Sequence, residues 1–133
     1  MTTCPAQRRL RAALGAALLS TFLLTLLPAA ARGHWVKPEE IIAGLNQDPV
    51  LRDRLGVVQA YADPKLPRLL VIKVQRDIWE KVAAEKRLGL SQLWYETWHH
   101  NVDQGIVAVL DAKTDKSLVH YDANGLPQLV SDP

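Results

Sequence analysis

The sequence predicts a small α+β domain preceded by an export leader. Short apolar stretches bounded by turn residues alternate with stretches whose apolar residues recur at helical spacing, in the order helix, strand, strand, helix, strand, strand. The chain has 133 residues, and the part after the leader, about 100 residues, has the size of one domain. We therefore expect a single domain over residues 36–130, with an antiparallel sheet packed with helices.

Residues 1–31 have the composition of a signal peptide. Three arginines precede an uncharged apolar run over residues 12–31, and the segment contains no acidic residue. The triplet Ala29-Ala30-Ala31 suits signal peptidase and predicts a mature chain that starts at Arg32, in the periplasm or outside the cell. Because the run is about as long as a bilayer is thick, the alternative is an uncleaved leader that holds the protein at a membrane.

The charge and cysteine content exclude several classes of function. The chain has 16 basic and 14 acidic residues, and three of the basic ones lie in the leader. The remainder lacks the excess of Lys and Arg that a nucleic-acid surface needs, so nucleic acid is not an expected partner. Cys4, the only cysteine, also lies in the leader. Disulfides, thiolate catalysis and Cys-based zinc sites are therefore not expected in the domain.

The first half of the domain is expected to hold two helical pieces and a hairpin. Pro38 has the fixed φ that suits a first helical position. Asp48-Pro49 begins a second piece by a cap-and-proline pattern, and Gly56 ends it. Val57–Ala62 and Arg68–Val74 are expected to be strands, because turn-forming residues separate two apolar stretches.

The middle of the domain is expected to be helical. Asp77 and Glu80 form a capping-box pattern, in which two side chains satisfy two free amides at the start of a helix. Gly89 is expected to interrupt this helix, and Ser91 to cap a second one whose apolar stripe runs to about Asp103.

Two more strands are expected after the helices, at Ile106–Leu110 and Leu118–Tyr121. A turn at Asn124-Gly125 leads to a short edge piece at Leu126–Val130.

The stretch from Val107 to Asp122 resembles the closing hairpin of PepSY-type envelope domains, in which an Asp-Ala-Lys-Thr string precedes a glycine turn. Lys116 stands here where that glycine is expected. The resemblance covers a short part of the chain, and we carry no function across on it.

Two of the expected strands are apolar on both faces, at residues 69–72 and 106–110. A sheet with one wet face has strands that alternate between apolar and polar residues. Either the helices cover opposite faces of the sheet, or one face is left for a protein partner, a second copy of the chain or an apolar ligand.

The helical region carries three tryptophans, Trp79, Trp94 and Trp98. Their default role is in the core, although the N–H group of each needs a partner. The alternative is that they border a groove beside the sheet that holds a hydrophobic or aromatic ligand. On this interpretation the protein is a non-catalytic binding or accessory domain that needs no cofactor.

A second interpretation is a metal-binding envelope protein that uses Glu96, His99 and His100. Glu-x-x-His is a spacing with which one helix presents two ligands to a metal. A carboxylate one turn from a histidine also stabilises a helix by itself, which is the simpler explanation. Cleavage before His34 would add an amino-terminal copper ligand, but it requires a different cleavage site.

No catalytic motif is present. The serines after the leader are Ser91, Ser117 and Ser131, and none lies in a Gly-x-Ser-x-Gly sequence. The chain has no glycine-rich phosphate loop and no Cys-x-x-Cys-His haem motif. An enzyme is therefore not the expected function.

Overall fold

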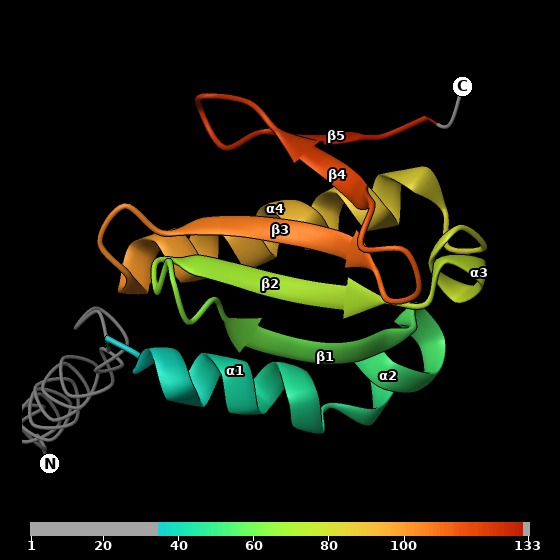
Figure 1. Ribbon diagram of the computed structural model, residues 1–133. Helices are drawn as coiled ribbons and strands as arrows, with labels where there is room; N and C mark the ends of the chain where they lie inside the picture. Colours follow the sequence, from blue (N-terminus) through green and yellow to red (C-terminus); the bar gives the residue numbers. More distant parts are fainter. Residues whose placement is uncertain (1–34, 132–133) are drawn as a thin grey trace, which may run out of the picture. The chain divides into compact units, whose positions relative to one another are not determined.

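The computed structural model describes residues 35–131 and shows one sheet with helices packed against it (Figure 1). The helices are α1 (Pro38–Gln47), α2 (Pro49–Leu55), α3 (Arg76–Trp79) and α4 (Ala84–Asn101). The strands are β1 (Val57–Ala62), β2 (Leu69–Val74), β3 (Ile106–Asp111), β4 (Ser117–Tyr121) and β5 (Pro127–Leu129). The predicted α+β class is confirmed. The expectations for the leader, the cleavage site and His34 lie outside the described residues.

The first two helices begin where the sequence predicts, and the second ends at the expected glycine. Pro38 and Pro49 are the first residues of α1 and α2. The Asp48 side chain accepts hydrogen bonds from the amides of Val50 and Leu51, which otherwise lack partners in the first turn of α2. Gly56 ends α2 with φ of 73°, a conformation that glycine adopts without steric cost.

The sheet is mixed, with strand order β1-β2-β3-β4-β5. Strands β2 and β3 are parallel, whereas the other neighbouring strands are antiparallel. The expectation of an antiparallel sheet is therefore wrong for this central pair. The reason is that α3 and α4 form a crossover connection between β2 and β3, which makes two neighbouring strands parallel.

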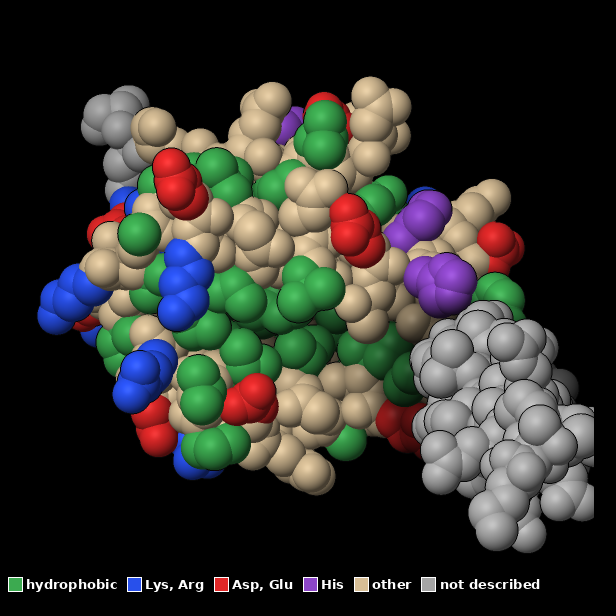
Figure 2. Space-filling model, turned by 180° about the vertical axis from the view of Figure 1, so that it is seen from behind, with side chains coloured by type: hydrophobic (Ala, Val, Ile, Leu, Met, Phe, Trp, Pro, Cys, Tyr) green, Lys and Arg blue, Asp and Glu red, His purple; other side chains and the backbone are tan. Residues whose placement is uncertain are grey.

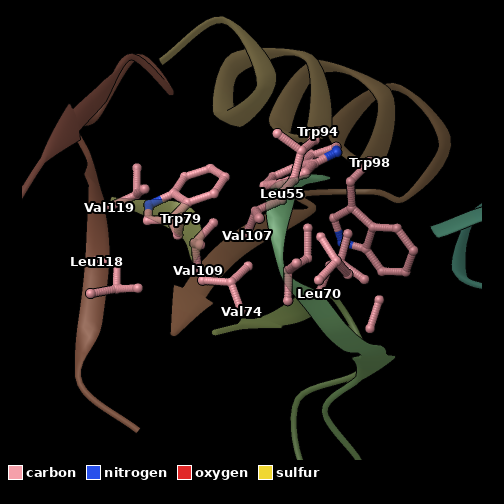
Figure 3. Packing of buried hydrophobic residues seen from close by; sticks show 13 residues of the cluster. Leu55, Leu70, Val74, Trp79, Trp94, Trp98, Val107, Val109, Leu118 and Val119 are labelled. Atoms are coloured by element: carbon pink, nitrogen blue, oxygen red, sulfur yellow. The ribbon is translucent and has the colours of Figure 1, made fainter. Parts of the chain in front are cut away.

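The helices form one layer on one face of the sheet. Leu70, Ile72 and Val74 of β2 are fully buried, and they belong to one core cluster with side chains of α2, α3 and α4 (Figure 3). In Figure 1, no described helix lies in front of the other face, where Ala108 and Leu110 are half-buried. Helices that cover opposite faces, the first of the two alternatives, are therefore not found.

Helix α4 is one continuous helix, so the expected interruption at Gly89 and the cap at Ser91 are wrong. Ser91 is fully buried in the middle of the helix. Its hydroxyl donates a hydrogen bond to the Arg87 carbonyl oxygen at 2.7 Å. Because the hydroxyl of Ser91 bonds to the preceding turn, this residue is accommodated inside a helix and not only at its start. Burial of the apolar side chains of α4 outweighs the low helix propensity of Gly89.

The expected capping box at Asp77 and Glu80 is also wrong. Helix α3 follows Gln75, which makes no side-chain cap hydrogen bond. Glu80 instead accepts a hydrogen bond from Arg76 Nε at 2.7 Å. A basic residue four positions away competes for the carboxylate that the cap would need.

Both edges of the sheet are protected against the addition of a strand. At β1, the Asn46 side chain of α1 donates to the Ala60 carbonyl oxygen at 2.9 Å and accepts from the Ala60 amide at 2.8 Å. At the other edge, β5 is three residues long and begins with Pro127, which has no amide hydrogen. Occupied or missing main-chain groups of this kind prevent pairing with another chain.

The β3–β4 loop is held by the Asp111 carboxylate. Asp111 accepts hydrogen bonds from the Thr114 hydroxyl at 2.7 Å and from the Lys113 amide at 3.2 Å. These bonds stabilise the ionised form, and the pKa of Asp111 is therefore lower than its ordinary value, 3.8.

We expect Asp111 to make the stability of the domain depend on pH in acid. A carboxyl group whose pKa is lower in the folded state contributes stability that is present above the unfolded-state value and is lost as the pH falls through the folded-state value. Asp111→Asn lacks this contribution. As the pH falls below the ordinary value of 3.8, its free energy of unfolding should therefore decrease less than that of the wild type. Urea unfolding at a series of pH values measures this. Asp103→Asn, which changes an exposed carboxylate outside the loop, should keep the wild-type pH dependence.

Candidate functional site

An apolar groove with a volume of about 540 Å³ lies between α1 and α4. Leu70 of β2 lies at its floor, and Leu51 of α2 closes one part of the wall. Figure 2 shows a hollowed band of apolar side chains on this face of the molecule, with acidic side chains along its margins. Asp48, between α1 and α2, also lines the groove. The other lining residues belong to the two long helices: Glu40, Ile41, Gly44, Leu45, Leu90, Leu93, Trp94 and Thr97.

The α1 wall of the groove includes a residue without a side chain, which leaves the groove open. Gly44 lines the groove, and a Cβ atom built on it would have no neighbour within 4 Å. Opposite it, Leu93 of α4 remains 55% exposed. When a ligand covers an exposed leucine beside an apolar groove, apolar surface leaves water and the free energy falls.

The structure places the three tryptophans in different environments (Figure 3). Trp79 and Trp98 are 1% and 0% exposed, so both are core residues. The indole N–H of Trp98 donates to the Arg68 carbonyl oxygen at 2.8 Å. Trp94 is 6% exposed, stacks on Trp79 at 5.8 Å and also lines the groove. Of the three residues expected to border a binding face, Trp94 alone is in contact with the groove, and its role in binding stays a prediction.

The sequence did not identify the α1 wall of the groove. Ile41 and Leu45 are apolar residues four positions apart in α1, a spacing that places them on one side of the helix. Both are half-buried and pack against the core, and both also line the groove. The periodicity of one helix does not reveal how far away its neighbour lies, so sequence cannot distinguish a core stripe from a groove wall.

Arg87 lies two turns before Trp94 on α4, on the same side of the helix as Leu90 and Trp94. Its Nε atom is buried and has no hydrogen-bond partner among the described residues. In Figure 2, basic side chains gather at one end of the apolar band. A buried guanidinium nitrogen without an acceptor is costly, and an anion that supplied one would lower that cost.

The residues of the metal hypothesis do not converge. Glu96 is exposed on α4. The Nδ1 atom of His99 donates to the Gly105 carbonyl oxygen at 2.8 Å, and the ring of His100 stacks on Trp35 at 5.1 Å. Within residues 35–131, no group of three or more His, Cys, Asp or Glu side chains is placed to hold a metal ion. The metal hypothesis stays a prediction that no feature of this structure favours.

A second cavity is lined by a serine, a histidine and an aspartate, which are Ser117, His120 and Asp122. These three residues are not arranged as a catalytic set. The Ser117 hydroxyl donates to the Val119 carbonyl oxygen at 2.9 Å. Asp122 accepts hydrogen bonds from the amides of Asn124 and Leu126 and thereby holds a turn. The Ser117 hydroxyl therefore makes its hydrogen bond to the main chain and not to His120, whereas covalent catalysis needs a nucleophile bonded to its base.

Among the described residues, no helix has the length and hydrophobicity to cross a bilayer. Comparisons of the chain with protein-family models, with curated proteins and with solved structures find no match.

Proposed function

We propose that this protein is an exported, non-catalytic binding domain whose working surface is the groove between α1 and α4. The observation that carries the proposal is the open apolar groove itself, with Trp94 and Leu93 on one wall and Gly44 on the other. Its volume of about 540 Å³ lies in the range of sites for small molecules, about 300–1,000 Å³. The exported location rests on the composition of the leader.

We infer that the ligand is an amphiphile with an apolar body and an anionic group. The groove supplies mainly apolar contacts along its length. Arg87 does not line the groove, but it stands on α4 one turn before the lining residue Leu90, and its buried Nε lacks a partner in the described structure. The charged residues that line the groove, Glu40 and Asp48, are acidic, so we place the anionic group at the end of the band where basic side chains gather (Figure 2). A ligand anion beside this cation would form a charge-assisted hydrogen bond, which is stronger than a neutral one.

Filling the groove should abolish binding while the fold is kept. We expect anilinonaphthalene sulfonate, a fluorescent probe with an aromatic body and one negative charge, to bind the full-length protein. In Gly44→Leu the new side chain occupies the groove, so the affinity for the probe should fall at least about tenfold. Gly89→Leu is the matched control, because Gly89 is also helical, has no atom within 4 Å of a built Cβ and does not line the groove.

Both glycine variants should be at least as stable as the wild type. Leucine has a higher helix propensity than glycine by roughly 0.8 kcal/mol, so thermal unfolding should show no loss of stability. A loss of binding in Gly44→Leu therefore reports occupation of the groove and not unfolding. Equal probe affinity in both variants would overturn the proposed site.

The anionic part of the proposal has its own control. Phenylnaphthylamine has the same aromatic body as the probe and no charge. Arg87→Gln should weaken binding of the sulfonate probe and leave binding of the neutral one unchanged. If the affinity for both probes falls equally, Arg87 contributes only packing, and the expected ligands are apolar molecules without an anionic group.

A further inference from the structure

The sheet is split between β3 and β4. Their pairing ends at Val109 and Val119, although β3 begins at Ile106 and β4 continues to Tyr121. Figure 1 shows β4 turning away from β3 along this part of the sheet. A cavity of about 430 Å³ lies in the split and is lined from both strands.

On the β3 side, the main chain of Val107 faces the split. The amide of Ile106 donates to the Arg68 carbonyl oxygen, and the amide of Ala112 donates to that of Val74. Even-numbered positions of β3 therefore bond toward β2. Because main-chain groups alternate in direction along a strand, the N–H and C=O of Val107 point toward β4, where the register offers no partner.

On the β4 side, the main chain of Tyr121 faces the same split. The amide of Asp122 donates to the Leu126 carbonyl oxygen, and the amide of Val130 donates to that of Leu118. Even-numbered positions of β4 therefore bond toward β5. By the same alternation, the N–H and C=O of Tyr121 point toward β3, across the cavity from Val107.

A side chain and a main-chain carbonyl of α4 hold β4 in this position. The rings of Tyr95 and Tyr121 stack with centroids 5.5 Å apart, and the Tyr121 hydroxyl donates to the Ser91 carbonyl oxygen at 2.8 Å. Burial raises the pKa of the Tyr121 phenol, which keeps this donor protonated. The cavity is lined by apolar groups together with polar ones such as Ser117. The split is therefore a supported feature of the fold.

We propose that this split binds an extended peptide segment of a partner polypeptide, which pairs with Val107 on one side and Tyr121 on the other. Main-chain N–H and C=O groups on both walls are complementary to a peptide backbone, because each donor and acceptor needs a partner when buried. The ordinary positions for strand addition are protected at β1 by Asn46 and at β5 by Pro127. The split offers main-chain groups on two walls, whereas each edge of the sheet is blocked at one position.

The test is an NMR titration of isotope-labelled full-length protein with an acetylated and amidated Val-Thr-Val-Thr peptide. Before addition, the amide hydrogen of Val107 should exchange with solvent at least about tenfold faster than that of Val109, which is paired. On addition, the amide signals of Val107 and Tyr121 should shift, and exchange at Val107 should slow.

The control is the same peptide with its main-chain nitrogens methylated, which removes the donors and leaves the side chains. It should produce no shift at Val107. Equal shifts with the methylated peptide, shifts confined to other residues, or no shift up to the solubility limit of the peptide would each overturn the proposal. Gly44→Leu should bind the peptide like the wild type, so this test is independent of the groove.

Discussion

Replacement of Ile72 by aspartate should prevent the domain from folding. Ile72 is fully buried in β2, between β1 and β3. A carboxylate at this position would have no partner, and an unpaired buried charge costs several kcal/mol even after relaxation. That cost is comparable to the whole stability of a small domain, about 5–15 kcal/mol. Far-ultraviolet circular dichroism and the one-dimensional proton NMR spectrum measure the loss of structure.

Val58→Asp is the matched control for this change. Val58 lies on the neighbouring strand β1 but is 53% exposed, so its carboxylate would remain hydrated. This variant should fold, with a change in the free energy of unfolding of less than about 1 kcal/mol. A folded Ile72→Asp protein would mean that β2 is not an interior strand of the sheet.

Truncation of Trp98 should be the most damaging of the neutral substitutions. The side chain is fully buried and its indole N–H bonds to the Arg68 carbonyl oxygen. Trp98→Ala leaves a large cavity and should cost about 3–5 kcal/mol. Chemical denaturation with urea, followed by circular dichroism, measures the free energy of unfolding.

Phenylalanine substitutions separate the hydrogen bond from the packing. Trp98→Phe removes the hydrogen bond to the Arg68 carbonyl oxygen, which contributes about 1 kcal/mol. Trp79→Phe removes a buried indole N–H that has no partner in the described structure, so part of its packing loss is offset. We therefore expect Trp98→Phe to be the more destabilising of the two. The opposite order would show that the Trp98 hydrogen bond contributes nothing measurable.

The elements of this fold that depend on neighbouring residues were predicted well from sequence. Pro38 and Pro49 begin helices because the proline ring fixes φ near the helical value. Gly56 ends a helix because glycine adopts a positive φ without steric cost. The expected strands follow from short apolar stretches between turns. The expected interruption at Gly89 is wrong because burial of α4 overrode a weak local preference. The expected capping box is wrong because Glu80 bonds to Arg76 instead.

The candidate site was predicted less well, for a geometric reason. Sequence placed Trp79, Trp94 and Trp98 together on a helical region, but it could not show which of them packs inward. In the structure Trp94 reaches the groove, while the other two fill the core. Gly44 gave no signal at all, because its effect depends on the distance between two helices that are far apart in the sequence.

The sequence alone determined the α+β class, the helix ends at the prolines, and the apolar character of β2 and β3. All of these follow from the conformational limits and hydrophobicity of residues that are close together in the chain. Only the tertiary structure decided that β2 and β3 are parallel, that the helices share one face, that a groove remains beside Gly44, and that the sheet splits beyond Val109. These features depend on how distant segments pack, and the free energies that select them are summed over contacts that no local pattern contains.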